Sequence, residues 1–566
     1  MDGNLLIRGG AVVDGTGAPQ RRADVRIRAG RIAEVAGSLR PDGEEVFDAG
    51  GAVVAPGFID THAHVDAQVF WDPSLDPEPL HGVTTLLTGN CSLSLYPVSD
   101  ATRTDISDLF AYIEDVPRHL FDDSVPWDWS DYAGYAEAVN RVGTGANLAP
   151  LVGHSMIRLA VMGADAWSRI ARPDETAAMA SILATAMADG AWGLSTSHLD
   201  VDSQGRPVPS RQADDAEVDA LLDAIGGFGR GLVEIVPALL DKEGQFDRME
   251  SLARRCGARR LPLTWTGFAV SDRDPSFVVR WMELARRLQR EGVPFYPQLS
   301  PRTVDFRLNW DSSMMFMSLP RGWHRVVAAR GEEAKATLLS DPEWREAARQ
   351  EWDTVERALF PHRRPEKVRF VEVVGADQER WRGRTLADLV AETGGHPSDV
   401  LADFVLANAC RPGLVAQGVA NADVEAVATV LTDPTVLISS SDAGAHMQML
   451  CASGDSTLLL TRHVRERQDL TLEAAVHALT GRQADLFGFG GRGRITEGAV
   501  ADLAVFALDE LHYDQDGFVE DLPGEGMRLR RGEGGYRATF VAGRAVQVGG
   551  QPTGALPGRV ISSAQA

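Results

Sequence analysis

The stretch Pro56-Gly57-Phe58-Ile59-Asp60-Thr61-His62-Ala63-His64 decides how the rest of the sequence is interpreted. An apolar run typical of a β-strand ends here in the pattern His-x-His. Side chains two residues apart on a strand point the same way, so His62 and His64 can face one metal ion. The alternative interpretation is a chance pair of surface histidines.

This stretch lies in the first of eight short apolar runs that alternate with helix-like segments such as 175–188, 216–225, 248–256 and 277–291. The eight runs are 53–59, 83–88, 148–153, 192–197, 232–237, 261–266, 293–299 and 436–440. Eight strands alternating with helices predict an α/β fold, a (β/α)₈ TIM-like barrel. Catalytic residues collect at the carboxyl ends of such strands, which is where His62 and His64 fall.

The two ends of the chain have a different pattern, with short strand-like runs separated by glycine-containing turns. They predict one small β-sandwich domain built from both termini, residues 1–52 and 495–566. The barrel then spans 53–494. Two inserts, at about 99–140 and 301–421, interrupt the alternation, and inserts of this length usually form a pocket wall or a lid.

Composition excludes several classes of function. The chain has 566 residues, and 80 Asp and Glu against 56 Lys and Arg give a net charge of −24, which disfavours nucleic acid and anionic membranes as partners. Four cysteines cannot form a disulfide framework. No apolar run is long enough for a transmembrane helix, and the N-terminus lacks a signal-peptide pattern. We expect a cytoplasmic protein, and the sequence leaves open whether it forms a homo-oligomer.

The second chemical motif is Ser439-Ser440-Ser441-Asp442-Ala443-Gly444-Ala445-His446, at the end of the eighth run. A carboxylate at this position can bind a metal, orient a water molecule and move its proton. The alternative is that Asp442 caps a helix. The presence of His62 and His64 favours the catalytic interpretation.

With these motifs the chain resembles the amidohydrolase superfamily and, within it, the D-aminoacylase (N-acyl-D-amino-acid deacylase) family. Beyond the His62 and Asp442 motifs, the matching stretches are Ile7-Arg8-Gly9-Gly10, Val13-Asp14-Gly15-Thr16-Gly17, Gly82-Val83-Thr84-Thr85, Gly89-Asn90-Cys91, Pro126-Trp127-Asp128-Trp129, Leu151-Val152-Gly153-His154-Ser155-Met156-Ile157-Arg158, and Gly498 with Ala501-Asp502-Leu503. The resemblance implies zinc-dependent hydrolysis of the amide in an N-acyl-D-amino acid. It also implies that Cys91 is a zinc ligand, although a buried thiol is the alternative.

The sequence departs from this family at two strands. The resembled deacylases carry a histidine at the end of the fifth and of the sixth strand, but this chain has Val233-Glu234-Ile235 and Leu263-Thr264-Trp265-Thr266 there. Glu234 could supply an oxygen ligand, or could be a salt-bridged or solvated glutamate. Trp265 cannot bind a metal, and it would shape the substrate pocket or pack in the wall.

Lysine is scarce, with only Lys242, Lys335 and Lys367 in the chain. None lies on the fourth strand, where many amidohydrolases carry a carboxylated lysine that bridges two metals. The remaining candidate ligands are His62, His64, Cys91, Glu234 and Asp442. They suit one zinc ion, with a weak second site as an open alternative.

Further polar residues are candidates for substrate binding. His154, His198 and His446 could bind substrate or stabilise an oxyanion, and the alternative is a structural histidine. Arg158, Arg302 and Arg211 could hold a carboxylate, although most arginines form surface ion pairs.

The sequence thus predicts a zinc-dependent amidohydrolase that acts on a small-molecule amide, most simply an N-acyl-D-amino acid. Asp442 would take the proton of the attacking water and return it to the leaving nitrogen. One alternative is another substrate on the same site, such as a cyclic amide, an ester or a natural product. A second alternative is a catalytically inactive scaffold.

Overall fold

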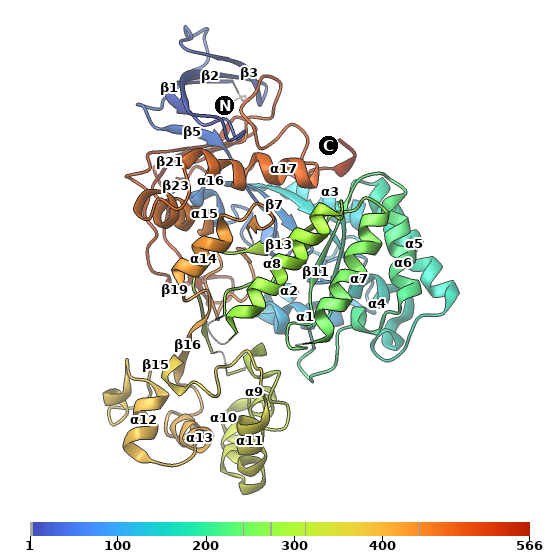
Figure 1. Cartoon of the computed structure of the whole chain (residues 1–566), viewed down its shortest axis with the longest axis vertical. Helices are drawn as coiled ribbons and strands as arrows, with labels where there is room; N and C mark the ends of the chain where they lie inside the picture. Colours follow the sequence, from blue (N-terminus) through green and yellow to red (C-terminus); the bar gives the residue numbers. More distant parts are fainter. Residues whose placement is uncertain are drawn as a thin grey trace.

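The computed structural model describes residues 4–241, 243–271, 274–308, 310–311, 313–439 and 441–565 (Figure 1). Eight parallel strands form its centre, one of them bent between β8 and β9. They are β6 (Phe58–Asp60), β7 (Val83–Thr88), β8 (Asn147–Pro150) with β9 (Val152–Gly153), β10 (Gly193–Ser197), β11 (Leu232–Val236), β12 (Leu263–Trp265), β13 (Phe295–Leu299) and β17 (Leu437–Ile438). A parallel bridge between Ala63 and Ala443 joins the chain after β6 to the chain after β17. The fold class is the predicted (β/α)₈ barrel with a terminal β domain.

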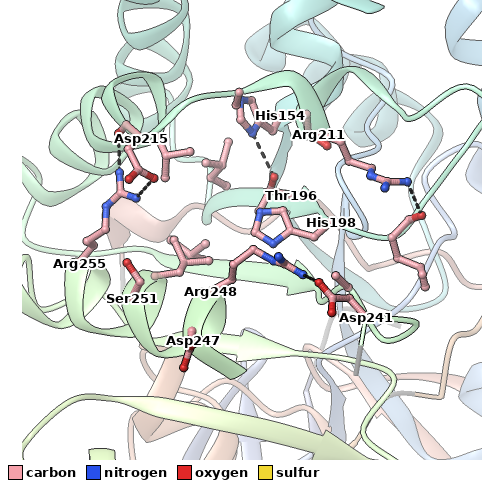
Figure 2. Close-up of a pocket in the computed structure, with 18 of the residues that line it drawn as sticks. His154, Thr196, His198, Arg211, Asp215, Asp241, Asp247, Arg248, Ser251 and Arg255 are labelled. Atoms are coloured by element: carbon pink, nitrogen blue, oxygen red, sulfur yellow. Dashed lines mark hydrogen bonds and ion pairs between the residues drawn. The ribbon is translucent and has the colours of Figure 1, made fainter. Parts of the chain in front are cut away.

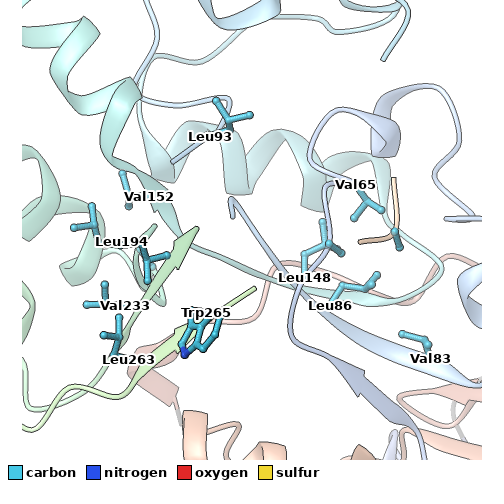
Figure 3. Close-up of a cluster of buried hydrophobic side chains, with 14 of the residues drawn as sticks. Val65, Val83, Leu86, Leu93, Leu148, Val152, Leu194, Val233, Leu263 and Trp265 are labelled. Atoms are coloured by element: carbon cyan, nitrogen blue, oxygen red, sulfur yellow. The ribbon is translucent and has the colours of Figure 1, made fainter. Parts of the chain in front are cut away.

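The barrel strands are apolar on the outside and partly polar on the inside. Leu194, Val233 and Leu263 line up across neighbouring strands and belong to the main core together with helix residues (Figure 3). Residues one position further along face inward, and Glu234 pairs in register with both Ser195 and Thr264. Because side chains alternate along a strand, this polar interior can present catalytic groups at the barrel mouth.

Helices cover the outside of the strands. They are α4 (His154–Met162), α5 (Pro173–Ala188), α6 (Asp215–Gly226), α7 (Gly244–Ala258), α8 (Pro275–Arg290), α14 (Val424–Leu431), α16 (Leu472–Leu479) and α17 (Gly481–Phe487). Local sequence explains their limits. The side chain of Asp214 accepts a hydrogen bond from the backbone N–H of Glu217, 2.9 Å away, and caps α6. Pro275 starts α8, which buries Trp281 against the barrel.

Strands from both ends of the chain form one nine-stranded sheet, in the order β23-β22-β21-β18-β5-β1-β2-β3, with β4 also paired to β1. Their bounds are β1 (Leu5–Val12), β2 (Arg21–Arg28), β3 (Arg31–Ala36), β4 (Glu45–Asp48), β5 (Val53–Pro56), β18 (Leu503–Phe506), β21 (Tyr536–Val541), β22 (Arg544–Val548) and β23 (Gln551–Pro552). Val25 on β2 and Phe540 on β21 share a core although their strands are not neighbours, so the sheet curls over itself.

The boundary between the terminal sheet and the barrel corrects one prediction. The run 53–59 is not a single barrel strand, because Val53–Pro56 pairs with β1 and β18 while Phe58–Asp60 pairs with β7. The two segments meet at Gly57, where a Cβ atom would lie 2.1 Å from the hydroxyl of Thr84. This close approach requires glycine, and the barrel begins at Phe58 rather than at residue 53.

The two long inserts fold differently. The first contains α1 (Arg103–Ile113), α2 (Arg118–Asp123) and α3 (Tyr132–Val142). The second contains β14 (Val304–Arg307), α9 (Trp323–Ala328), α10 (Gly331–Ser340), α11 (Pro342–Thr354), β15 (Val368–Glu372), α12 (Leu386–Thr393), α13 (Pro397–Ala407) and β16 (Gly413–Ala420). It has its own sheet and its own core around Trp323 and Trp344. Figure 1 shows this lobe at one end of the molecule and the terminal sheet at the other.

The C-terminal part also contributes a short helix α15 (Asp455–Leu458) and a hairpin of β19 (Gly517–Leu522) and β20 (Gly526–Arg530). Among the described residues, no helix combines the length and the apolar character needed to cross a membrane.

Candidate metal centre

His62 and His64 follow β6 and point into the barrel mouth, as the alternation of side chains predicts. Their Nε2 atoms lie 3.2 Å apart. The Sγ atom of Cys91, just after β7, lies 3.4 Å from Nε2 of His62 and 3.7 Å from Nε2 of His64. The three residues form one group of potential metal ligands, and all three are buried.

Asp442 lies beside the two histidines, in the loop after β17, which a parallel bridge joins to the chain after β6. Its Oδ1 atom lies 3.6 Å from Nε2 of His62 and 3.3 Å from Nε2 of His64. The backbone fixes this position, because the N–H of Asp442 donates to the carbonyl of His62 at 3.0 Å and the N–H of His64 donates to that of Ala443 at 2.6 Å. Both Asp442 and Cys91 have left-handed backbone conformations, with φ of 69° and 55°. This conformation is uncommon for residues other than glycine.

Glu114 is a member of the site that the sequence analysis missed. It follows α1 in the first insert, is 2% exposed, and places Oε1 3.3 Å from Nδ1 of His64. With His64 and Asp442 it forms a second group of potential ligands. The available signal was weak, since an acidic residue at the end of a surface helix is ordinarily solvated. Only the folding of the insert over the barrel mouth reveals its role.

Glu234, a candidate metal ligand from the sequence, does not face the other candidate ligand atoms. Its Oε2 atom accepts a hydrogen bond from the backbone N–H of Cys91 at 2.9 Å, and Oε1 lies 3.7 Å from Nδ1 of His62. It is therefore behind His62 and Cys91, on the side away from the facing Nε2 atoms, and belongs to neither ligand group. This position suits a carboxylate that orients His62 and fixes the Cys91 backbone.

Burial and mutual charge shift the pKa values in this site. Burial raises the pKa of Asp442, but the hydrogen bond from His64 and the nearby imidazoles outweigh it and hold the pKa well below its usual value. Burial lowers the pKa of His62 to about 3. Burial, together with Glu234 and Glu114, raises the pKa of the Cys91 thiol well above its usual value. These shifts keep Asp442 ionised beside the neutral imidazole of His62, so its carboxylate can accept a hydrogen bond from a water molecule.

A cavity of about 250 Å³ opens onto these residues. Much of its remaining wall is apolar and comes from the second insert, including Phe306, Met314 and Met315. His446 and Arg302, both predicted to bind substrate, line it. Nε2 of His446 lies 3.6 Å from Oδ2 of Asp442. The guanidinium of Arg302 donates to the carbonyl of Ser441 at 2.6 Å and lies 3.5 Å from Oδ1 of Asp455, which supports the loop that carries Asp442.

Of the two roles predicted for Trp265, shaping the substrate pocket or packing in the wall, the structure supports packing in the wall. The residue is fully buried, and its ring centroid lies 4.5 Å from that of Trp281 on α8. It does not line the cavity at the metal centre, whereas its neighbour Thr266 does. The alternation along β12 turns Trp265 outward, so it packs in the wall.

His154 and Arg158 form a buried cluster away from the metal centre. Nε2 of His154 lies 2.7 Å from Oε1 of Glu217, Nδ1 lies 3.0 Å from the hydroxyl of Thr196, and Arg158 is ion-paired with the same glutamate. Arg158 is fully buried, so it cannot hold a substrate carboxylate. His154, His198 and Arg211 line a different cavity, outside the barrel wall.

Neither of the two lysines that the structure describes lies at the metal centre. Lys335 and Lys367 both lie in the second insert, the first 3.2 Å from Asp311 and the second donating to the carbonyl of Gly418. Lys242 lies outside the described residues. The fourth barrel strand, β10, contains no lysine, in line with the sequence expectation.

A family model and several known proteins match most of this chain. A sequence model of the amidohydrolase family matches residues 45–547. An uncharacterised protein of Mycobacterium tuberculosis (strain H37Rv) is 32% identical, covering 97% of this chain and 92% of its own length. The N-acyl-D-glutamate deacylase of Alcaligenes xylosoxydans xylosoxydans is 29% identical, covering 89% and 88%. The crystal structure of N-acyl-D-glutamate deacylase from Bordetella bronchiseptica, complexed with zinc and a phosphonate inhibitor, has the same fold, with a TM-score of 0.66, 24% identity and 99% coverage of both chains.

Proposed function

We propose, from the premise that this chain belongs to the amidohydrolase family, that it hydrolyses an amide bond with the help of a bound metal ion. The observation that carries the proposal is the convergence of His62, His64, Cys91 and Asp442 at the barrel mouth. The relatives named as deacylases point to N-acyl-D-amino acids as the class of substrate.

The donor atoms fit a zinc ion. Two imidazole nitrogens, a thiolate sulfur and a carboxylate oxygen are the ligand types that zinc prefers. Among the described residues, Nδ1 of both His62 and His64 has no hydrogen-bond partner, but each faces a buried carboxylate 3.7 or 3.3 Å away. Carboxylates behind ligand histidines are common, because they fix the ring and leave Nε2 free for the metal. One zinc ion held by His62, His64 and Cys91, with Asp442 beside it, is therefore the proposed cofactor.

Zinc bound here would lower the pKa of a water molecule to roughly 7 and polarise the scissile carbonyl. The chain's own residues then perform the proton transfers. Oδ2 of Asp442 faces the cavity and His446, so it can take the proton of the attacking water and return it to the leaving nitrogen. Glu114 and Glu234 orient the two histidines. The apolar wall from the second insert excludes water around the acyl group.

The substrate class is tested with a panel of N-acyl-D-amino acids and their L-enantiomers, assayed with the zinc-loaded protein for release of the free amino acid. The proposal predicts hydrolysis of D-compounds and a strong preference over the L-series. Equal turnover of both series, or turnover of neither, would contradict the N-acyl-D-amino acid assignment.

A second candidate is hydrolysis of a different amide, a cyclic amide or an ester on the same metal centre. Two residues favour this second candidate. Glu234 on β11 and Thr266 directly after β12 come from the two strands where the resembled deacylases carry histidines. A panel of cyclic imides and lactones distinguishes the two candidates. Turnover of these compounds, with none of the acylated amino acids, would select the second.

A further inference from the structure

A second and larger cavity, of about 880 Å³, lies outside the barrel wall (Figure 2). Its walls are the outer faces of β10 and β11, the helices α6 and α7, and the loops that follow the two strands. Of its lining residues only Leu199 also lines the cavity at the metal centre. Its volume is in the range of small-molecule binding sites.

The floor of this outer cavity is apolar. Leu194 and Val233 point outward from the strands, and Val218, Leu222 and Leu252 face them from the helices. Tightly packed side chains usually fill the space between a barrel and its helices. An open cavity with a floor of this kind can accommodate the apolar body of a ligand.

Two of the three arginines around the cavity are already neutralised. Arg248 contacts Asp241 at 2.5 Å, and Arg255 contacts Asp215 at 2.6 Å. Figure 2 shows the Arg255 pair on one side of the cavity and Arg211 on the other.

Arg211 differs from both of them. It donates from Nη1 to the carbonyls of Leu199 and Asp200, at 2.9 and 3.1 Å, and within the described ranges it has no ion-paired carboxylate. One side of its guanidinium is thus anchored and the other is left for a ligand. Burial lowers its pKa, but an arginine remains charged at neutral pH.

His198 provides a second polar group beside the apolar floor. Its Nδ1 atom is buried and has no hydrogen-bond partner among the described residues. Figure 2 shows the ring between Thr196 and Arg248. Burial lowers the pKa of His198 to about 4, so the imidazole is neutral and can donate one hydrogen bond.

We propose that this outer cavity is a binding site for a small molecule with one carboxylate and an apolar body. Arg211 pairs with the carboxylate, because a guanidinium that forms no ion pair within the described ranges favours an anion that it can bind through two N–H groups. His198 donates to the same group, and the leucine and valine floor takes the apolar body.

The outer cavity is separate from the metal centre. Leu199 packs with Cys91 and Val236, and Leu239, Leu240 and Met317 pack against these three residues. The cluster lies between the two cavities, since Leu199 lines both of them and each of the other members lines one. Binding in the outer cavity therefore needs neither the metal nor Asp442, and it is independent of the proposed function.

The test is isothermal titration of the full-length, metal-loaded protein with octanoate and with the matched neutral octanamide. Octanoate is expected to bind, and the amide to bind at least about tenfold more weakly, because it lacks the charge that pairs with Arg211. Absence of octanoate binding at millimolar concentration, or equal affinity for the amide, would overturn the proposal.

Variants locate the binding site. Ser251→Trp fills the outer cavity from the exposed surface of α7, and Ser181→Trp on α5 is the matched control outside the cavity. Val419→Trp fills the cavity at the metal centre instead. We expect Ser251→Trp and Arg211→Gln to lose octanoate binding and the other two to keep it. Loss in Val419→Trp with retention in Ser251→Trp would place octanoate on the metal and refute the outer site.

Discussion

Glu114 Oε1 lies 3.3 Å from Nδ1 of His64, although the two residues come from the first insert and the first barrel strand. The contact links the first insert, which folds over the barrel mouth, to the metal centre. Carboxylates that hold a ligand histidine in this way raise its basicity and fix its tautomer.

Replacing Glu114 therefore tests whether the insert supports metal binding. We expect Glu114→Gln to weaken zinc affinity by about 10–100-fold, because the His64 ring loses its charged partner. Competition with a chromogenic chelator measures this affinity. Glu137→Gln, an exposed glutamate on α3 of the same insert, is the control and should bind zinc like the wild type. Unchanged affinity in Glu114→Gln would assign Glu114 a structural role only.

Cys91 and Cys256 are both buried free cysteines, which makes them a matched pair. Cys91→Ser should lower zinc affinity, since a serine hydroxyl is a much poorer ligand than a thiolate. Cys256→Ser lies in the core at α7 and should change stability without changing zinc affinity. The same chelator competition applies. Equal zinc affinity in the Cys91 variant would remove Cys91 from the ligand set.

Much of this site could be predicted from the sequence because it depends on local pattern. His62 and His64 follow a strand, and Asp442 follows another, so the barrel rule places them at one mouth. Glu114 could not be predicted, because its position depends on how an insert folds back. The choice between the two roles of Trp265 could not be made from the sequence, because the start of β12 was unknown and a shift of one residue exchanges the two faces of a strand.

The buried cluster around Glu217 should contribute mainly to stability. Glu217→Gln leaves the fully buried guanidinium of Arg158 without its counter-charge, and we expect a loss of about 3–5 kcal/mol in the free energy of unfolding. Thermal and denaturant unfolding measure the loss. The control Asp122→Asn breaks the surface pair with Arg118, for which about 0–1 kcal/mol is expected. Equal effects of the two variants would contradict the assignment of Glu217 to a buried ion pair.

His81 predicts a pH dependence of stability. Its Nδ1 accepts from the hydroxyl of Thr457 at 2.8 Å and its Nε2 donates to the carbonyl of Gly532 at 3.0 Å, an arrangement that fits the neutral ring. Burial lowers its pKa to about 3 from the usual 6.5. Below pH 6.5 the unfolded chain takes up a proton at His81 that the folded chain does not, which favours unfolding. The contribution of the neutral His81 to the free energy of unfolding is therefore complete above pH 6.5 and is lost as the pH falls towards 3.

The loss from His81 amounts to at most about 1.4 kcal/mol per pH unit. His81→Gln cannot titrate, so its stability deficit relative to the wild type should shrink as the pH is lowered. Melting temperatures at a series of pH values measure this, with His119→Gln, at the protein surface, as the control. A deficit that stays constant with pH would contradict a neutral, buried His81.

We propose that Asp442 moves the proton in a metal-dependent hydrolysis. Turnover of an N-acyl-D-amino acid that the wild type hydrolyses, measured alongside the zinc content of wild type and Asp442→Asn, tests it most directly. We expect Asp442→Asn to keep zinc, through His62, His64 and Cys91, and to lose at least about a hundredfold in kcat. Wild-type turnover in the zinc-loaded Asp442→Asn protein would contradict it.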